Sequence, residues 1–296
     1  MFPCVDGKYL KNPMMRVLCT SLVLSFYFLT GPVGVPLPYR QTKTTDATVN
    51  ACPIDPEQPI YMTTLSRSFQ NSQAVMIPAY FQPGSLWDQA ISGTPTVTVL
   101  VMNPNNGPGL SASPAYLATV NNAQNNGIQV MGYVHTKYGR RNLQKVLDEI
   151  STYMRWYSVD GIFLDEASAD PIQINYYQVL AKHIRSFLNK QVILNPGRFP
   201  DETYLTLSDI LVVFEGTYQS YKHLVVPSWA YLHSADHFAH IVYDASTKGQ
   251  MKKAIRWSRE RKAGLIFVTN DKVPNPCDTL PAYWLAELEE IRTRLP

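Results

Sequence analysis

Short apolar segments recur along the chain from residue 74 to residue 271, and few of them show the polar alternation of a strand with one exposed face. They are rich in β-branched residues, and continuous apolar runs of this kind are typical of strands that are buried on both faces. The pattern predicts eight strands, over 74–80, 96–104, 128–135, 159–166, 191–197, 209–216, 238–244 and 264–271.

Helical patterns lie between these segments. Residues 142–156 place apolar side chains on one stripe, which is typical of a helix that packs on a core. Ser113 and Pro114 are a helix start, an N-cap residue followed by proline at the first helical position, and Gly127 marks that helix's end. The predicted helices cover 114–126, 142–156, 170–189, 246–261 and 281–294.

The alternation of strands and helices predicts parallel strands joined by right-handed crossovers. Eight such units fit an α/β fold of the (β/α)8 TIM-type barrel class, which takes roughly 250 residues, and we assign it to residues 73–296. A doubly wound open sheet is the alternative. It is less favoured because no glycine-rich phosphate loop follows the first strand, where that fold usually has one.

The first 72 residues have a different character. Lys8, Lys11 and Arg16 precede an apolar stretch, 17–35, whose most apolar part has the length of a signal-peptide core. We therefore predict that residues 1–35 are a secretion signal, or an uncleaved membrane anchor because no Ala-x-Ala cleavage site is visible. Residues 36–72 are predicted to be a linker and lead-in. Both alternatives predict a secreted or extracellular protein, attached to a membrane in the second case.

The composition of the chain limits which partners and cofactors it is expected to bind. The formal net charge is +3, charged residues make up 17% of the chain, and no run of five like charges occurs. Nothing therefore indicates nucleic-acid binding or a polybasic membrane patch. The chain contains neither a Walker A motif nor a Gly-x-Gly-x-x-Gly motif. We expect a monomer that needs no cofactor.

The four cysteines divide into two pairs along the sequence. Cys4 and Cys19 fall within the predicted signal, which leaves Cys52 and Cys277 near the two ends of the remaining chain. In an exported protein a disulfide between these two cysteines is the expected use. Two free buried cysteines are the alternative.

Carboxylates follow the fourth and sixth predicted strands. Asp165 and Glu166 end the fourth, and Glu215 ends the sixth. In a barrel of this class the chemistry lies at the carboxyl ends of the strands. Side-chain alternation sends Asp165 and Glu166 to opposite sides, so at most one of them shares the face of Phe163. Two carboxylates that face each other across a pocket are what cleavage of a glycosidic bond requires.

Polar and aromatic residues occupy several other strand ends. We predict that they bind a sugar, with Tyr80 or Tyr138 stacking on its ring and the amides, His135 and Tyr133 positioning its polar groups. The predicted binding residues are Tyr80, Asn103, Tyr133, His135, Tyr138 and Asn195.

Several longer segments resemble a known family. The stretches VMNPNNGPG (101–109) and GYVHTKYGRR (132–141), the segment from Trp156 to Glu166, and LNPG with FEG downstream resemble the spherulin-4 family. That family includes secreted or membrane-anchored microbial polysaccharide hydrolases, among them endo-α-1,4-N-acetylgalactosaminidases. The resemblance implies a glycoside hydrolase acting on such a polymer, with an acidic trio at Asp165, Glu166 and Glu215.

By analogy with other barrel glycosidases we expect a retaining mechanism, with Asp165 as nucleophile and Glu215 as general acid and base. Glu166 would tune the pKa of its neighbours or bind a substrate group. A non-catalytic carbohydrate-binding or developmental surface protein of the same fold is the alternative function. A metal-dependent hydrolase using His233, His237 and His240 is disfavoured, because these residues lie just before the seventh strand and at its beginning, at the end of the barrel opposite the chemistry. We therefore expect no metal site.

Overall fold

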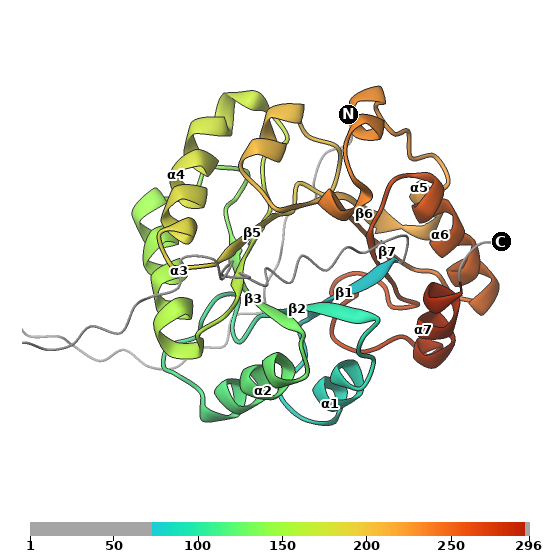
Figure 1. Ribbon diagram of the computed structural model, residues 1–296, viewed down its shortest axis with the longest axis horizontal. Coiled ribbons are helices and arrows are strands. Elements are labelled where there is room, and N and C mark those ends of the chain that lie inside the picture. Colours follow the sequence, from blue (N-terminus) through green and yellow to red (C-terminus); the bar gives the residue numbers. More distant parts are fainter. Residues whose placement is uncertain (1–72, 294–296) are drawn as a thin grey trace, which may run out of the picture. The chain divides into compact units, whose positions relative to one another are not determined.

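The computed structural model describes residues 73–293, which belong to one compact unit. All eight predicted strands are present and parallel, and they close into a barrel in which each strand pairs with the next and β8 pairs with β1 (Figure 1). The (β/α)8 TIM-type fold is thereby confirmed. The strands are β1 Ala74–Ala79, β2 Val97–Met102, β3 Gln129–His135, β4 Gly161–Asp165, β5 Gln191–Leu194, β6 Ile210–Thr217, β7 Phe238–Tyr243 and β8 Leu265–Val268.

Helices surround the barrel, and each predicted helical segment contains one (Figure 1). The segment predicted over 170–189 divides into a short 3-10 turn, η1, and a helix that ends earlier than expected. Two short helices, α1 and α5, were not predicted. The helices are α1 Ser85–Ile91, α2 Pro114–Asn125, α3 Leu143–Tyr157, η1 Pro171–Gln173, α4 Ile174–Arg185, α5 Tyr218–Tyr221, α6 Lys248–Glu260 and α7 Trp284–Arg292.

The ring of helices is incomplete after β5 and β6. The connection from β5 to β6 contains only the 3-10 turn η2 (Glu202–Thr206), and α5 has a single turn before η3 (Ser228–Leu232) and η4 (Ala235–His237). The connection, residues 195–209, is long enough for the dozen or so residues of a crossover, yet it forms no α-helix. Its first residues instead pair with β6 through a bridge between Arg198 and Phe214.

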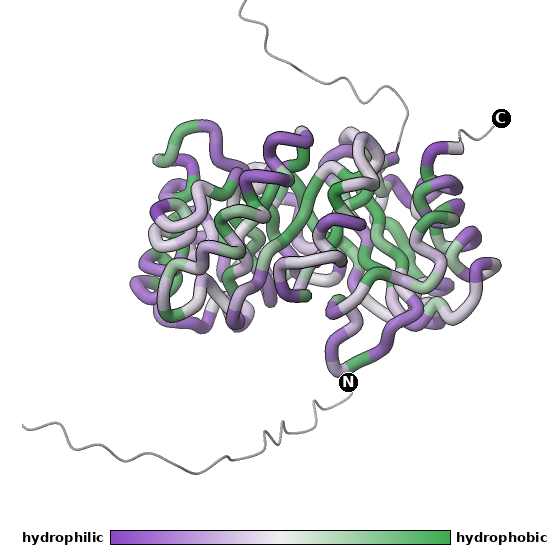
Figure 2. The backbone as a smooth tube through the Cα atoms, turned by 90° about the horizontal axis from the view of Figure 1, so that it is seen from below, coloured by the Kyte–Doolittle hydropathy of each residue, from purple (hydrophilic) through white to green (hydrophobic). Residues whose placement is uncertain are grey.

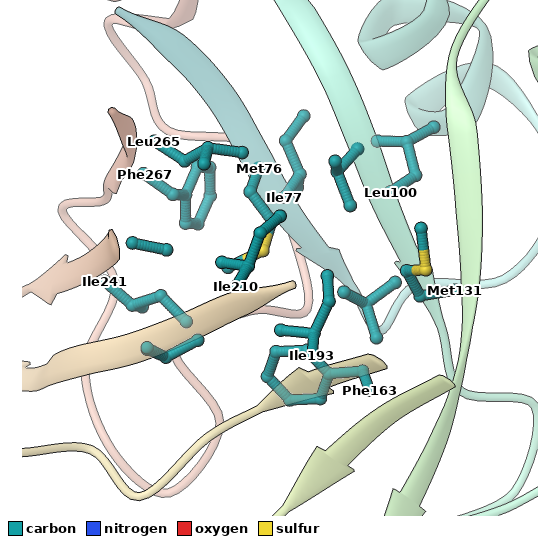
Figure 3. Close-up of a cluster of buried hydrophobic side chains, with 14 of the residues drawn as sticks. Met76, Ile77, Leu100, Met131, Phe163, Ile193, Ile210, Ile241, Leu265 and Phe267 are labelled. Carbon is teal, nitrogen blue, oxygen red and sulfur yellow. The ribbon is translucent and has the colours of Figure 1, made fainter. Parts of the chain in front are cut away.

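The barrel interior is a packed apolar core. Neighbouring strands bring inward-facing residues level with one another, so that Phe163 pairs with Ile193 and Ile241 pairs with Phe267. Figure 3 shows these side chains filling the space between the strands together with Met131, and each is at most 1% exposed. Figure 2 shows hydrophobic strands inside and hydrophilic segments mostly on the outer helices and loops. Strands buried on both faces are what the continuous apolar runs predicted.

Three predictions concern residues that the structure does not describe. The predicted signal or anchor (1–35), the linker (36–72) and Cys52 lie outside the described range. Within residues 73–293, no helix has the length and apolar character needed to cross a membrane. Cys277 is a free and buried thiol in the described part of the chain, and its predicted disulfide with Cys52 stays a prediction. The Cys277 carbonyl accepts a hydrogen bond from the amide of Tyr80, which holds this residue against the barrel wall.

Candidate functional site

One amide group links two of the carboxylates that were predicted as site residues because they lie at the carboxyl ends of strands. Asp165 is the last residue of β4, Glu215 lies near the end of β6, and Asn195 directly follows β5 between them. The Nδ2 of Asn195 donates to Asp165 Oδ1 at 2.7 Å and to Glu215 Oε2 at 2.5 Å. An amide nitrogen carries two protons, so both bonds form at once. Asp165 and Glu215 are thereby held on the two sides of a single side chain.

The orientation of the Asn195 amide is set by the backbone around it. Its Oδ1 accepts from the amide of Gly197 at 3.0 Å, and its main chain continues the β4–β5 ladder through bonds with Leu164 and Ala167. The side chain is 4% exposed. Because the oxygen is engaged on the loop side, the two N–H groups point toward the carboxylates.

Asp165 receives a second donor from the neighbouring strand. The Tyr133 hydroxyl donates to Asp165 Oδ2 at 2.8 Å, and the Tyr133 ring stacks on Phe163 and meets Tyr80 edge to face. Burial raises the pKa of Asp165, while the hydrogen bonds from Tyr133 and Asn195 oppose that rise. Asp165 shares the barrel face of Phe163, as side-chain alternation predicted.

Glu215 is the second carboxylate of the pair. Solvent reaches it from the open mouth, yet the barrel wall around it desolvates the carboxyl group, and this burial raises its pKa to about 7, with the charge of Asp165 adding to the rise. It receives a donor from Asn195, whereas Asp165 receives donors from Asn195 and Tyr133. Since hydrogen bonds to the charged form favour ionisation, the second donor favours the ionised form of Asp165 more than that of Glu215.

Glu166 stands apart from this pair. Its backbone adopts a left-handed conformation with φ 48°, which ends strand β4, and its carbonyl accepts bonds from the Thr136 hydroxyl and the Tyr138 amide. Its Oε2 lies 3.6 Å from His135 Nδ1, and 42% of the side chain is exposed. Asp165 and Glu166 therefore face different surroundings, as predicted.

The remaining predicted residues differ in how close they come to the carboxylates. Tyr133 and Asn195 contact them, Tyr80 joins through its ring contact with Tyr133, and His135 lies beside Glu166. Asn103 instead accepts the Gly107 amide at 3.0 Å and shapes the loop after β2. Tyr138 lies on the loop after β3 with half of its side chain exposed.

Sequence reasoning did not select two residues at the mouth. The charge of Glu215 raises the pKa of both the Tyr243 hydroxyl and the Cys277 thiol, after burial as the main cause. Tyr243 ends β7, so the strand-end rule could have included it. Cys277 lies in a loop far along the chain, and no sequence pattern signals its return to the mouth.

The three histidines near β7 lie in separate surroundings. His233 contacts Glu202, His237 contacts the carbonyl of Asp209, and His240 is buried against the Tyr221 hydroxyl. They follow η3, end η4 and lie within β7 respectively, so they do not share a helix face. Among residues 73–293, no group of three or more His, Cys, Asp or Glu side chains is arranged to hold a metal ion.

Comparison with known proteins gives matches over most of this barrel. The family described as Spherulation-specific family 4 matches residues 74–291. Spherulin-4 of Physarum polycephalum is 39% identical over 148 residues, which span 48% of this chain and 44% of that protein. The crystal structure of Aspergillus clavatus Sph3 in complex with GalNAc superposes with a TM-score of 0.64 at 25% identity, covering 75% of this chain and 98% of that one. The described fold is thus shared with a sugar-bound protein, and less than half of Spherulin-4 is matched.

Proposed function

The chain belongs to spherulation-specific family 4, and from that premise we propose that it is a glycoside hydrolase that cleaves a polysaccharide containing α-1,4-linked N-acetylgalactosamine. The observation that carries the proposal is the Asn195 amide that joins Asp165 to Glu215. A binding site for neutral sugar has no need of two carboxyl groups held together with opposed protonation states, whereas hydrolysis of a glycosidic bond requires them.

The separation of the carboxyl groups supports a retaining mechanism. Both oxygens contact the same nitrogen, at 2.7 and 2.5 Å, so they lie within about 5 Å of each other, close to the about 5–5.5 Å typical of retaining enzymes. Inverting enzymes hold the groups about 6.5–9.5 Å apart to admit a water molecule. The pair here leaves no room for that water without moving apart.

The environment of each group suits a different step. The two donors to Asp165 favour its ionised form, and this carboxylate would attack the anomeric carbon. Glu215, whose pKa is about 7, would give its proton to the leaving oxygen and later remove one from the water that releases the product. Glu166, with His135 beside it, would bind a polar group of the sugar next to the reacting ring.

The substrate class rests on relatives. Sph3, at 25% identity, was crystallised with GalNAc, and the partly exposed ring of Tyr80, which meets Tyr133 edge to face, could pack against a sugar ring. We further propose that the protein is exported and acts on polysaccharide outside the cell as a monomer, in line with the apolar segment at 17–35.

The test is turnover of an α-1,4-linked N-acetylgalactosamine polymer, followed by mass spectrometry of the products. D165N and E215Q should each lower kcat by about 10²–10⁴-fold, and E260Q, an exposed glutamate on α6, is the matched control. Full turnover by D165N would refute the assignment. Sugar binding without any product from the parent protein would instead indicate a carbohydrate-binding protein.

A further inference from the structure

A second hollow adjoins the carboxylate pair at the same end of the barrel. Its volume is about 560 Å³, and three loops line it, those after β3, β4 and β5. Two of its lining residues directly follow site residues, since Ala167 comes after Glu166 and Pro196 comes after Asn195. A polysaccharide that lies across the carboxylates and extends toward this side would place a neighbouring sugar in the hollow.

The loop after β3 presents an aromatic ring and a guanidinium in a fixed arrangement. Lys137, Tyr138 and Gly139 all have positive φ, at 50°, 55° and 77°, a conformation that non-glycine residues adopt only where the surroundings impose it. The Tyr138 amide donates to the Glu166 carbonyl at 2.6 Å, and the Nε of Arg140 donates to the Lys137 carbonyl. The Arg140 guanidinium lies 5.8 Å from the centre of the Tyr138 ring. The loop therefore fixes the positions of the Tyr138 ring and the Arg140 guanidinium before any ligand binds.

Arg198 belongs to the opposite wall and is attached to the catalytic strand. It forms an antiparallel bridge with Phe214, and the amide of Glu215 donates to the carbonyl of Gly197 at 3.1 Å. A side chain at Gly197, where φ is 64°, would be strained by this left-handed backbone, and its Cβ would lie 3.6 Å from the Cβ of Glu215. The arginine is thus positioned by the same backbone that positions Glu215.

Positively charged side chains outnumber negatively charged ones in the lining of the hollow. Within residues 73–293, neither Arg140 nor Arg198 has an ion-pair partner. The lining contains one carboxylate, Asp170, and its Oδ1 already accepts the Ile172 amide. Guanidinium groups bind carboxylates and sulfate-like oxyanions through paired hydrogen bonds. Two unpaired arginines facing one hollow are suited to an anion, and the adjacent tyrosine ring suits the apolar face of a sugar.

We propose that this hollow is a subsite for a sugar unit that carries an anionic group, a carboxylate or a sulfate ester, next to the unit whose bond is cleaved. The position of the subsite relative to the cleaved bond rests on the proposed function. Its charge preference is a property of Arg140 and Arg198 and can be measured by binding alone.

The test compares three forms of one α-1,4-linked N-acetylgalactosamine hexasaccharide: unmodified, oxidised to uronate at its primary hydroxyls, and sulfated at those hydroxyls. Affinity is measured by calorimetry on the D165N protein at low and high salt. At low salt we expect at least one anionic form to bind about tenfold more tightly than the unmodified form, and the gain to shrink at high salt. The anionic form whose affinity rises more, uronate or sulfate ester, identifies the anionic group that the subsite prefers.

Charge-removing variants then locate the effect. R140Q and R198Q should each reduce the ratio of anionic to unmodified affinity by severalfold, and together they should abolish it. R155Q, which removes the same charge from an exposed position on α3, should leave the ratio unchanged. Equal affinity for all three hexasaccharides, or a preference that survives in the double variant, overturns the proposal. If the parent protein cleaves none of the hexasaccharides while the preference for an anionic form remains, the proposed function is overturned instead. The two failures are therefore distinguishable.

Discussion

The hydroxyl of Tyr133 provides the most direct test of how the site controls ionisation. The Y133F substitution removes the 2.8 Å hydrogen bond to Asp165 Oδ2 while it leaves the ring that stacks on Phe163. A hydrogen bond to a charged group contributes about 1.5–3 kcal/mol, and a change of about 1.4 kcal/mol equals one pKa unit. The donor favours the ionised form, so its removal raises the pKa of Asp165, by about 1–2 units.

The pH dependence of kcat/KM reports this change. In the proposed mechanism activity requires ionised Asp165 and protonated Glu215. The acidic limb of a bell-shaped profile would then follow the first group, and the basic limb would follow the second, near pH 7. In Y133F the acidic limb should move upward by about 1–2 pH units, with a much smaller movement of the basic limb. The limbs then lie closer together, so the maximum of the profile also falls.

A matched variant separates this effect from a general loss of stability. The hydroxyl of Tyr116 on α2 is buried and has no hydrogen-bond partner among residues 73–293, so Y116F removes the same atom without removing a bond there. Its pH profile should be that of the parent protein. If the acidic limb of Y133F stays in place while its melting temperature also stays unchanged, then Tyr133 does not control the ionisation of Asp165 and the reasoning is wrong.

Three further predictions concern the barrel. G132A should lower the melting temperature, with a cost of about 1–3 kcal/mol from overpacking, because the new methyl group would lie 2.6 Å from the Tyr153 ring. Glu287 is buried, and desolvation holds its pKa well above the usual range. The parent protein should therefore lose stability as the pH rises above about 4.5 toward the folded-state pKa. Thermal denaturation between pH 5 and pH 9 should show a smaller loss of stability for E287Q than for the parent protein. Cys277 is buried and its pKa is raised by desolvation; in a variant with Cys4, Cys19 and Cys52 replaced by serine, a thiol reagent should label it only after denaturant is added, and fast labelling of the native protein would contradict this.

The strands could be predicted closely because each is buried on both faces and so has an unbroken apolar sequence. The first, expected over 74–80, is Ala74–Ala79, and the seventh, expected over 238–244, is Phe238–Tyr243. The missed helices lacked such a signal. Helix α1 has seven residues and begins after Gly84, which provides no side-chain cap, and α5 has only four residues. Short helices held by tertiary contacts leave little periodicity in the sequence.

The candidate site could be predicted in part. The strand-end rule selected Asp165, Asn195 and Glu215, because parallel strands of a barrel bring their carboxyl ends to one mouth. The direction of the Asn195 amide could not be read from the sequence, since it depends on the Gly197 amide that engages its oxygen. The left-handed backbone of Glu166 was also unpredictable, because alternation applies only while the strand continues.

The connection between β5 and β6 explains several of these features together. It carries the 3-10 turn η2 in place of a crossover helix, and its first residues pair with β6 through Arg198 and Phe214. That pairing sets the Gly197 amide against Asn195 and the Gly197 carbonyl against the amide of Glu215. The same few residues thus orient the amide between the carboxylates and set Arg198 at the wall of the hollow. This irregular connection is therefore part of how the barrel holds its carboxyl groups.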